Sequence, residues 1–171
     1  MTWPDTSIRE YMDRLSRPTP HWAGGAAAAL AGAEAWALLA MAFGIIQKKD
    51  PEPELESLVA RSLASRDLLV ELAEADVLAV KALSKDLSQE AWIKATRVPL
   101  TIIATARAGL VAATHPARSR LSQAEPDFGT AEALFMACMT SARLIVSANL
   151  SGINEPTRTE LSNALQDLIA P

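Results

Sequence analysis

Apolar side chains recur along most of this chain every three or four residues, which is the spacing of an α-helix with a buried face. No stretch of useful length alternates apolar and polar residues as a half-buried strand does. The pattern therefore predicts six helices, over residues 6–17, 25–48, 55–83, 88–114, 129–150 and 157–169.

Polar and proline-containing segments separate these helices and supply their ends. Asp5 or Thr6 is expected to cap the first helix, and Ser88 the fourth. Residues 117–127 are polar and are expected to be irregular, with Asp127 as the N-cap of the fifth helix. Thr157 and Glu160 have the spacing of a capping box for the last helix.

Pro99 falls inside the fourth predicted helix, because the apolar period continues on both sides of it. A proline in a helix removes one backbone hydrogen bond and favours a kink. Such a kink would shape a pocket in the bundle.

The second predicted helix is apolar on nearly every side, so we expect it to contact several neighbours and to form the centre of the fold. Pro18 and Pro20 favour an extended approach to it, and Gly24 and Gly25 allow backbone angles that other residues avoid. The small residues that follow allow another helix to come close, or a ligand to reach the backbone amides at the helix start.

These features predict an all-α fold, an up-and-down bundle of long antiparallel helices that forms a single domain over residues 1–171. The third and fourth helices are joined by a short break and are expected to form an antiparallel hairpin. Their apolar residues occupy more than one face, which leaves surface for a second copy to cover. We therefore predict a homodimer.

Composition excludes some classes of function. Sixteen basic residues stand against twenty acidic ones, with a formal net charge of −4, so no nucleic-acid partner is expected. Residues 23–46 approach the length of a membrane span, but their Ala and Gly content and the charge of Glu34 favour a buried helix of a soluble protein. Cys138 is the only cysteine and is predicted to be a buried apolar side chain, as suits a cytoplasmic protein.

Carboxylates among apolar residues are the first candidates for chemistry. Asp76 and Glu34 both have such surroundings in the sequence, although an internal carboxylate also serves to pair with an arginine or to cap a helix. His21 and His115 lack further ligands at metal-binding spacing, so no metal site is expected. Lys49 and Arg97 are either solvated or available to neutralise an anionic ligand.

Five motifs in order along the chain resemble the cyclodeaminase/cyclohydrolase family of folate metabolism. They are the Pro-Thr-Pro segment before the Gly-Gly and Ala-rich helix, Glu74-Ala-Asp76, Ala95-Thr-Arg-Val-Pro-Leu100, Asp127-Phe-Gly129 and Ala148-Asn-Leu150. The resemblance spans residues 8–153 and implies an all-helical dimer that acts as a formiminotetrahydrofolate cyclodeaminase or a methenyltetrahydrofolate cyclohydrolase. It also implies a tetrahydrofolate derivative as substrate and no tightly bound cofactor.

The resemblance assigns roles to particular residues of this chain. Asp76, Asp127 and Lys85 become candidates for catalysis. Substrate binding is then expected from Gly24, Gly25, Lys49, Arg97 and Asn149, with the ligand either between two subunits or beneath the first helix.

The glycine segment departs from the family pattern, which leaves a second function open. The family has three glycines and a serine directly after Pro-Thr-Pro, whereas this chain has His21 and Trp22 there, and Ala26 in place of the serine. The alternative is a non-catalytic helical relative that binds a ligand or serves in assembly.

Overall fold

A computed structural model describes residues 6–18 and 24–170, and the structural statements below concern those residues. It contains helices and no strand in that part of the chain. The α-helices are α1 (Ile8–Leu15), α2 (Gly24–Lys49), α3 (Pro53–Leu83), α4 (Gln89–Ala113), α5 (Glu125–Asn149) and α6 (Thr157–Ile169). Three short 3-10 helices, η2 (Pro116–Arg120), η3 (Ser122–Ala124) and η4 (Leu150–Gly152), connect them. The predicted all-α fold is confirmed.

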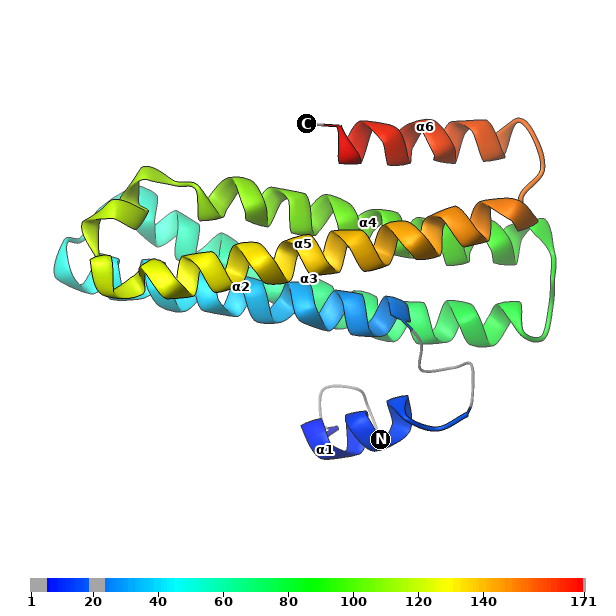
Figure 1. The fold of residues 1–171 in the computed structure, drawn as a ribbon, viewed down its shortest axis with the longest axis horizontal. Coiled ribbons are helices and arrows are strands. Elements are labelled where there is room, and N and C mark those ends of the chain that lie inside the picture. Colours follow the sequence, from blue (N-terminus) through cyan, green and yellow to red (C-terminus); the bar gives the residue numbers. More distant parts are fainter. Residues whose placement is uncertain (1–5, 19–23, 171) are drawn as a thin grey trace.

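The four long helices α2 to α5 lie side by side and run alternately up and down the molecule (Figure 1). The helix α6 lies along one side of this bundle, and α1 lies on the opposite side. One end of the bundle holds the start of α2 and the end of α5, and we call it the Gly24 end. The other holds the end of α2 and the start of α5, and we call it the Lys49 end.

The helix α2 forms the centre of the core, as predicted, and packs against α3, α4 and α5. Its Trp36 and Phe43 are fully buried. The Trp36 ring meets Phe135 of α5 edge to face with 5.4 Å between centroids, and Phe43 meets Phe128 in the same way at 5.3 Å. Cys138 is also fully buried, which confirms its predicted place, and burial raises the pKa of its thiol to about 12.

Two helix starts differ from the sequence-based expectation. The N-cap of α1 is Ser7, whose hydroxyl accepts a hydrogen bond from the Glu10 N–H at 3.2 Å, instead of Thr6; Asp5 lies outside the described residues. The N-cap of α6 is Pro156, and Thr157 is already helical. The carboxylate of Glu155 takes the capping role by accepting hydrogen bonds from the N–H and hydroxyl groups of Thr159.

The segment 117–127 is more regular than its polar composition predicts. It contains the 3-10 helices η2 and η3, and α5 begins at Glu125. Asp127 is therefore a residue of the first turn of α5 and not its N-cap. By contrast, Ser88 caps α4 as predicted, because its hydroxyl accepts a hydrogen bond from the Ala91 N–H at 3.3 Å.

Two segments, the helix Gly24–Lys49 and the stretch Ser122–Gly152, are long and apolar enough to cross a membrane. This is weak evidence for a span, because the core helix of a soluble protein has the same length and composition. The first of them is the central helix of the bundle, with 56% of its most apolar window buried inside the protein.

Candidate functional site

A single carboxylate is buried at the Gly24 end. Asp76 lies on the face of α3 that packs against α2, and only 2% of the residue is exposed. Its Oδ2 atom is buried and has no hydrogen-bond partner. Buried polar atoms are nearly always paired, so an unpaired one marks a position held for a reason other than stability.

Gly25 makes room for this carboxylate. A Cβ atom at position 25 would overlap the carboxylate carbon and both carboxylate oxygens of Asp76. The described glycines all have negative φ, so Gly24 and Gly25 are not needed for unusual backbone angles, contrary to the expectation from sequence. The predicted close approach is real, and its partner is the Asp76 side chain.

Burial and the start of α2 act on Asp76 in opposite directions. Loss of water raises the pKa of the carboxyl from 3.8 to about 6, and a hydrogen bond from the backbone N–H of Ala26 opposes that rise. The N-terminus of a helix also favours a negative charge, which keeps the ionised form accessible. A carboxyl group with this pKa exchanges a proton readily near neutral pH, as a general acid or base must.

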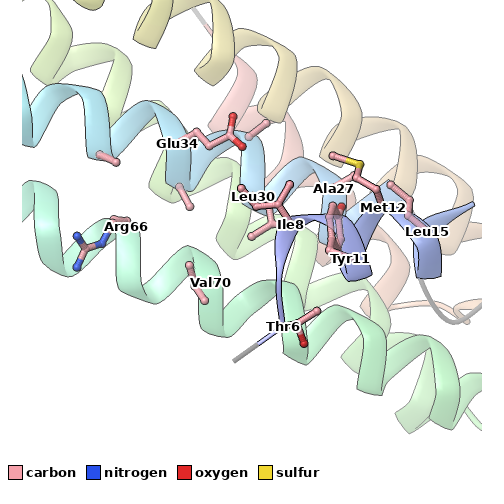
Figure 2. A pocket seen from close by; sticks show the side chains of 13 residues that line it. Thr6, Ile8, Tyr11, Met12, Leu15, Ala27, Leu30, Glu34, Arg66 and Val70 are labelled. Carbon is pink, nitrogen blue, oxygen red and sulfur yellow. The ribbon is translucent and has the colours of Figure 1, made fainter. Parts of the chain in front are cut away.

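A pocket of about 490 Å³ lies beneath α1 (Figure 2). Its walls are mainly apolar and come from α1, α2 and α3. On α2 it begins at Ala27, two residues after Gly25, and reaches Ala37; on α3 it includes Val70 and Arg66. Asp76 itself does not line it.

Few polar groups line the pocket. Tyr11 of α1 is 8% exposed, and burial together with the neighbouring charge of Glu34 raises the pKa of its phenol. Glu34 is exposed, so the expectation that it is an internal carboxylate is wrong: it lies on the outer face of α2. Figure 2 shows Glu34 and Arg66 at the part of the pocket that α1 leaves uncovered.

Comparison with known families bears on what this site does. Residues 7–166 match the model of a family described as formiminotransferase-cyclodeaminase. The chain belongs to the formiminotransferase-cyclodeaminase family. The match covers nearly the whole chain and confirms the resemblance found in the sequence.

The fold agrees with a solved cyclodeaminase. The crystal structure of formiminotetrahydrofolate cyclodeaminase from Thermotoga maritima superposes with a TM-score of 0.92 at 25% sequence identity. The match covers 99% of this chain and 91% of that one. No curated protein matched the sequence.

Three further residues that the family resemblance singled out lie at the Gly24 end. Gly24 is next to α5, since a Cβ atom there would lie 3.5 Å from Ile145 Cδ1. Asn149 is the last residue of α5 and is half-buried. Lys85 is exposed in the turn between α3 and α4.

The Asn149 side chain already has a structural partner. Pro99 has no N–H, so the carbonyl of Ala95, one turn earlier in α4, lacks its helical hydrogen bond. The Nδ2 group of Asn149 donates a hydrogen bond to that carbonyl at 2.9 Å. The other amide N–H and the Oδ1 atom of Asn149 are left for a ligand.

Arg97 lies elsewhere, on the exposed side of α4. It lines a second hollow of about 320 Å³ with Lys94 of the same helix and Leu72 of α3. Neither cation forms an ion pair with a described residue, so both are available to an anion.

Lys49 and Asp127 are at the far end of the bundle. Lys49 is the last residue of α2, which at 1.5 Å per residue places it about 36 Å from Gly25. Asp127 lies about 27 Å along α5 from Ile145, the neighbour of Gly24, at the same rise per residue. Lys49 and Asp127 are therefore too far away to contact a small ligand bound at Asp76 of the same subunit.

In the part of the chain that the structure describes, no group of three or more His, Cys, Asp or Glu side chains comes together. His115 bonds instead to Glu54 through Nε2 at 3.2 Å and accepts the Ala117 N–H through Nδ1. His21 lies outside the described residues.

Sequence reasoning named the space beneath the first helix as one of two places for the ligand, but it did not identify Tyr11 and Arg66 as residues that line a pocket there. The signal for the α1 wall of the pocket was the spacing of four apolar residues, which predicts one apolar face on the first helix: Ile8, Tyr11, Met12 and Leu15. The contribution of Arg66 had no such signal, because a charged residue on a long exposed helix is ordinarily solvated.

Proposed function

We propose that this family member is an enzyme that acts on a one-carbon derivative of tetrahydrofolate, either as a formiminotetrahydrofolate cyclodeaminase or as a methenyltetrahydrofolate cyclohydrolase. The observation that carries the proposal is the Asp76 carboxyl group, buried against Gly25 with one unpaired oxygen and a pKa of about 6. A group used only for packing would not keep this costly arrangement.

Asp76 acts as the proton carrier in this proposal. In the cyclodeaminase reaction a folate nitrogen attacks the formimino carbon, loses its proton, and ammonia leaves after gaining one. In the cyclohydrolase reaction water attacks the methenyl carbon and loses a proton. The bond from that carbon to one folate nitrogen then breaks as the nitrogen gains a proton, the remaining hydroxyl proton is released, and a formyl group is left. A single carboxyl group that ionises near neutral pH accepts the first proton and returns one to the leaving nitrogen. Its negative form also stabilises the positive methenyl group.

Other residues at the Gly24 end complete the proposed site. Gly24 is exposed and has no side chain to block the approach of the substrate to the start of α2, while Gly25 makes room for Asp76 beside it. Asn149 offers Oδ1 and its second N–H to the pterin edge, and Lys85 offers positive charge. Arg97 offers a further positive charge from outside this group, in the hollow on the exposed side of α4. The substrate is bound without a tightly held cofactor.

The two residues at the Lys49 end take part only if a second copy supplies them. A homodimer with antiparallel bundles brings Lys49 and Asp127 of one subunit toward the Asp76 region of the other. We propose this homodimer, in the cytoplasm, as the working form.

The decisive assay follows the absorbance of the methenyl group. Purified protein is mixed with methenyltetrahydrofolate to detect hydrolysis, and with formiminotetrahydrofolate to detect ring closure with ammonia release. We expect turnover with one of them, and Asp76→Asn is expected to lower kcat by about 100-fold or more.

Glu71→Gln is the matched control, because Glu71 is an exposed carboxylate on the same helix. It is expected to leave kcat unchanged. An Asp76→Asn variant with full activity would refute the assigned role, and a wild-type protein that neither turns over nor binds either folate would refute the function.

A further inference from the structure

We propose that the pocket beneath α1 binds the p-aminobenzoyl-glutamate part of the folate substrate, with the aromatic ring under α1 and the glutamate carboxylates at Arg66. The inference rests on the proposed function, because it places the reacting end of the same ligand at Asp76. It assigns a role to Tyr11, Ala31 and Arg66, which the catalytic proposal does not use.

The direction of the pocket supports this placement. It starts two residues from Gly25 on α2 and extends to Ala37, away from the Gly24 end. On α3, Arg66 precedes Asp76 by about 15 Å at 1.5 Å per residue. A folate has the same order of length between its one-carbon bridge and its glutamate carboxylates, so one molecule can reach both places.

The walls suit an aromatic ring with an amide. Tyr11 and Met12 of α1 lie over Ala27 and Leu30 of α2, and together they provide an apolar slot (Figure 2). Ligand pockets are typically of this kind, mostly apolar with a few polar groups that fix orientation. The volume of about 490 Å³ is within the range of small-molecule pockets.

Two opposite charges at the uncovered part of the pocket make the proposal specific. The Nε and Nη2 groups of Arg66 bond to Asp67, at 2.8 and 2.7 Å, and its Nη1 group has no partner among the described residues. Glu34 lines the same pocket and would repel a carboxylate. Removal of these two charges must therefore change the affinity for an anionic tail in opposite directions.

The test uses two probes that share the ring and the amide. One is p-aminobenzoyl-L-glutamate, and the other is 4-amino-N-methylbenzamide, which has no carboxylate; binding of each is measured by calorimetry at low salt. We expect Arg66→Met to weaken binding of the glutamate probe about tenfold and Glu34→Gln to strengthen it about threefold. Both variants should leave binding of the neutral probe within twofold.

Two further variants separate the pocket from general surface charge. Ala31→Leu adds a side chain to the α2 wall and is expected to abolish binding of both probes, while the melting temperature confirms that the chain is folded. Arg143→Met removes an exposed arginine of α5 that does not line the pocket and should change neither affinity.

The outcomes distinguish this inference from the proposed function. If tetrahydrofolate turnover is normal while Arg66→Met and Ala31→Leu leave both probe affinities and KM unchanged, the pocket assignment is wrong and the function stands. Failure of either probe to bind the wild-type protein also overturns the assignment. If tetrahydrofolates neither bind nor react while both probes follow the predicted pattern, the pocket stands and the proposed function fails.

Discussion

Asp76 holds its proton more tightly in the folded chain than in the unfolded one. Its folded pKa of about 6 lies above the usual value of 3.8 for an aspartate, so its contribution to stability is fully present below pH 3.8. That contribution is lost as the pH rises through about 6. The difference between the two pKa values corresponds to about 3 kcal/mol of folding free energy, and this stabilisation is absent at neutral pH.

Replacement of this carboxyl group should therefore alter the pH dependence of stability. We predict that the free energy of unfolding of Asp76→Asn falls less than that of the wild type between pH 4 and pH 7, because asparagine does not ionise. Urea denaturation across this range measures the difference between the two proteins and removes the shared contribution of the other carboxylates. Parallel curves would show that Asp76 ionises as it does in water.

A methyl group at position 25 tests the contact itself. Gly25→Ala is predicted to destabilise the fold by about 1–3 kcal/mol and to reduce turnover, because its Cβ atom displaces the Asp76 carboxylate. Gly44→Ala, in the same helix, meets no atom within 4 Å and should stabilise the protein by about 0.5–1 kcal/mol. Equal effects of the two changes on melting temperature would contradict the close contact.

Sequence reasoning found Asp76 but could not find its partner. A carboxylate between apolar residues of a long helix indicates burial, and that was enough to select Asp76. The same argument failed for Glu34, because the small residues around it leave the outer face of α2 open beneath α1. The pairing of Asp76 with Gly25 depends on the register of two helices, which a single sequence does not determine.

At the level of elements, a side chain of α5 replaces the hydrogen bond that a proline removes from α4. Pro99 deprives the Ala95 carbonyl of its helical donor, and the Asn149 side chain supplies a replacement from the end of α5. The helix α4 continues through Pro99 from Gln89 to Ala113. The hydrogen bond fixes the end of α5 against α4 at the Gly24 end.

This exchange of donors is testable by a double-mutant cycle. We predict that Asn149→Ala costs about 1–2 kcal/mol of stability, because it leaves the carbonyl of the buried residue Ala95 without a hydrogen-bond donor. In a Pro99→Ala background the residue at 99 has an N–H for Ala95, so the same Asn149→Ala change should cost less than half as much. Strict additivity in urea denaturation would show that the two sites are independent.

Helix number and order could be predicted from the sequence, but some helix ends could not. Apolar spacing over long segments identified every α-helix, and Ser88 marked the start of α4 correctly. The start of α6 was misjudged because Glu155, just before the helix, caps it in place of Thr157. The start of α5 was placed late because residues 117–127 have a polar composition yet form two 3-10 turns and the first helical turn.

At the scale of the whole molecule, two neighbouring helices present apolar outer faces. Met41 and Ile45 of α2 are 44% and 37% exposed, and Met136 and Leu144 of α5 are 61% and 63% exposed. The body of α2 carries one charge, Glu34, before its terminal lysines. The outer faces of α3 and α4, where the sequence analysis placed the surface for a second copy, carry many charges, so the α2 and α5 side is better suited to it.

We predict a dimer in solution through this side. Light scattering should give twice the mass of one 18.2 kDa chain, and Met136→Glu should shift the protein toward the monomer. Val111→Glu is the control, because Val111 is 67% exposed but belongs to α4. A wild-type monomer at micromolar concentration, or dissociation by both substitutions alike, would contradict this interface.

The distribution of candidate residues between two ends could not be predicted from sequence order. The family resemblance assigns Lys49 and Asp127 to the same site as Asp76. The antiparallel course of α2, α3 and α5 instead puts Lys49 and Asp127 at the Lys49 end of the bundle. Only the length of these helices, combined with their direction, reveals the separation.

The contact between Gly25 and Asp76 also constrains how this chain can change over evolutionary time. A mutation that adds any side chain at position 25 removes the space for the carboxylate, and loss of the carboxylate removes the need for glycine. In descendants that have lost the catalytic activity, substitutions at positions 25 and 76 should therefore occur together. Those that keep an acidic residue at 76 should tolerate nothing but glycine across from it.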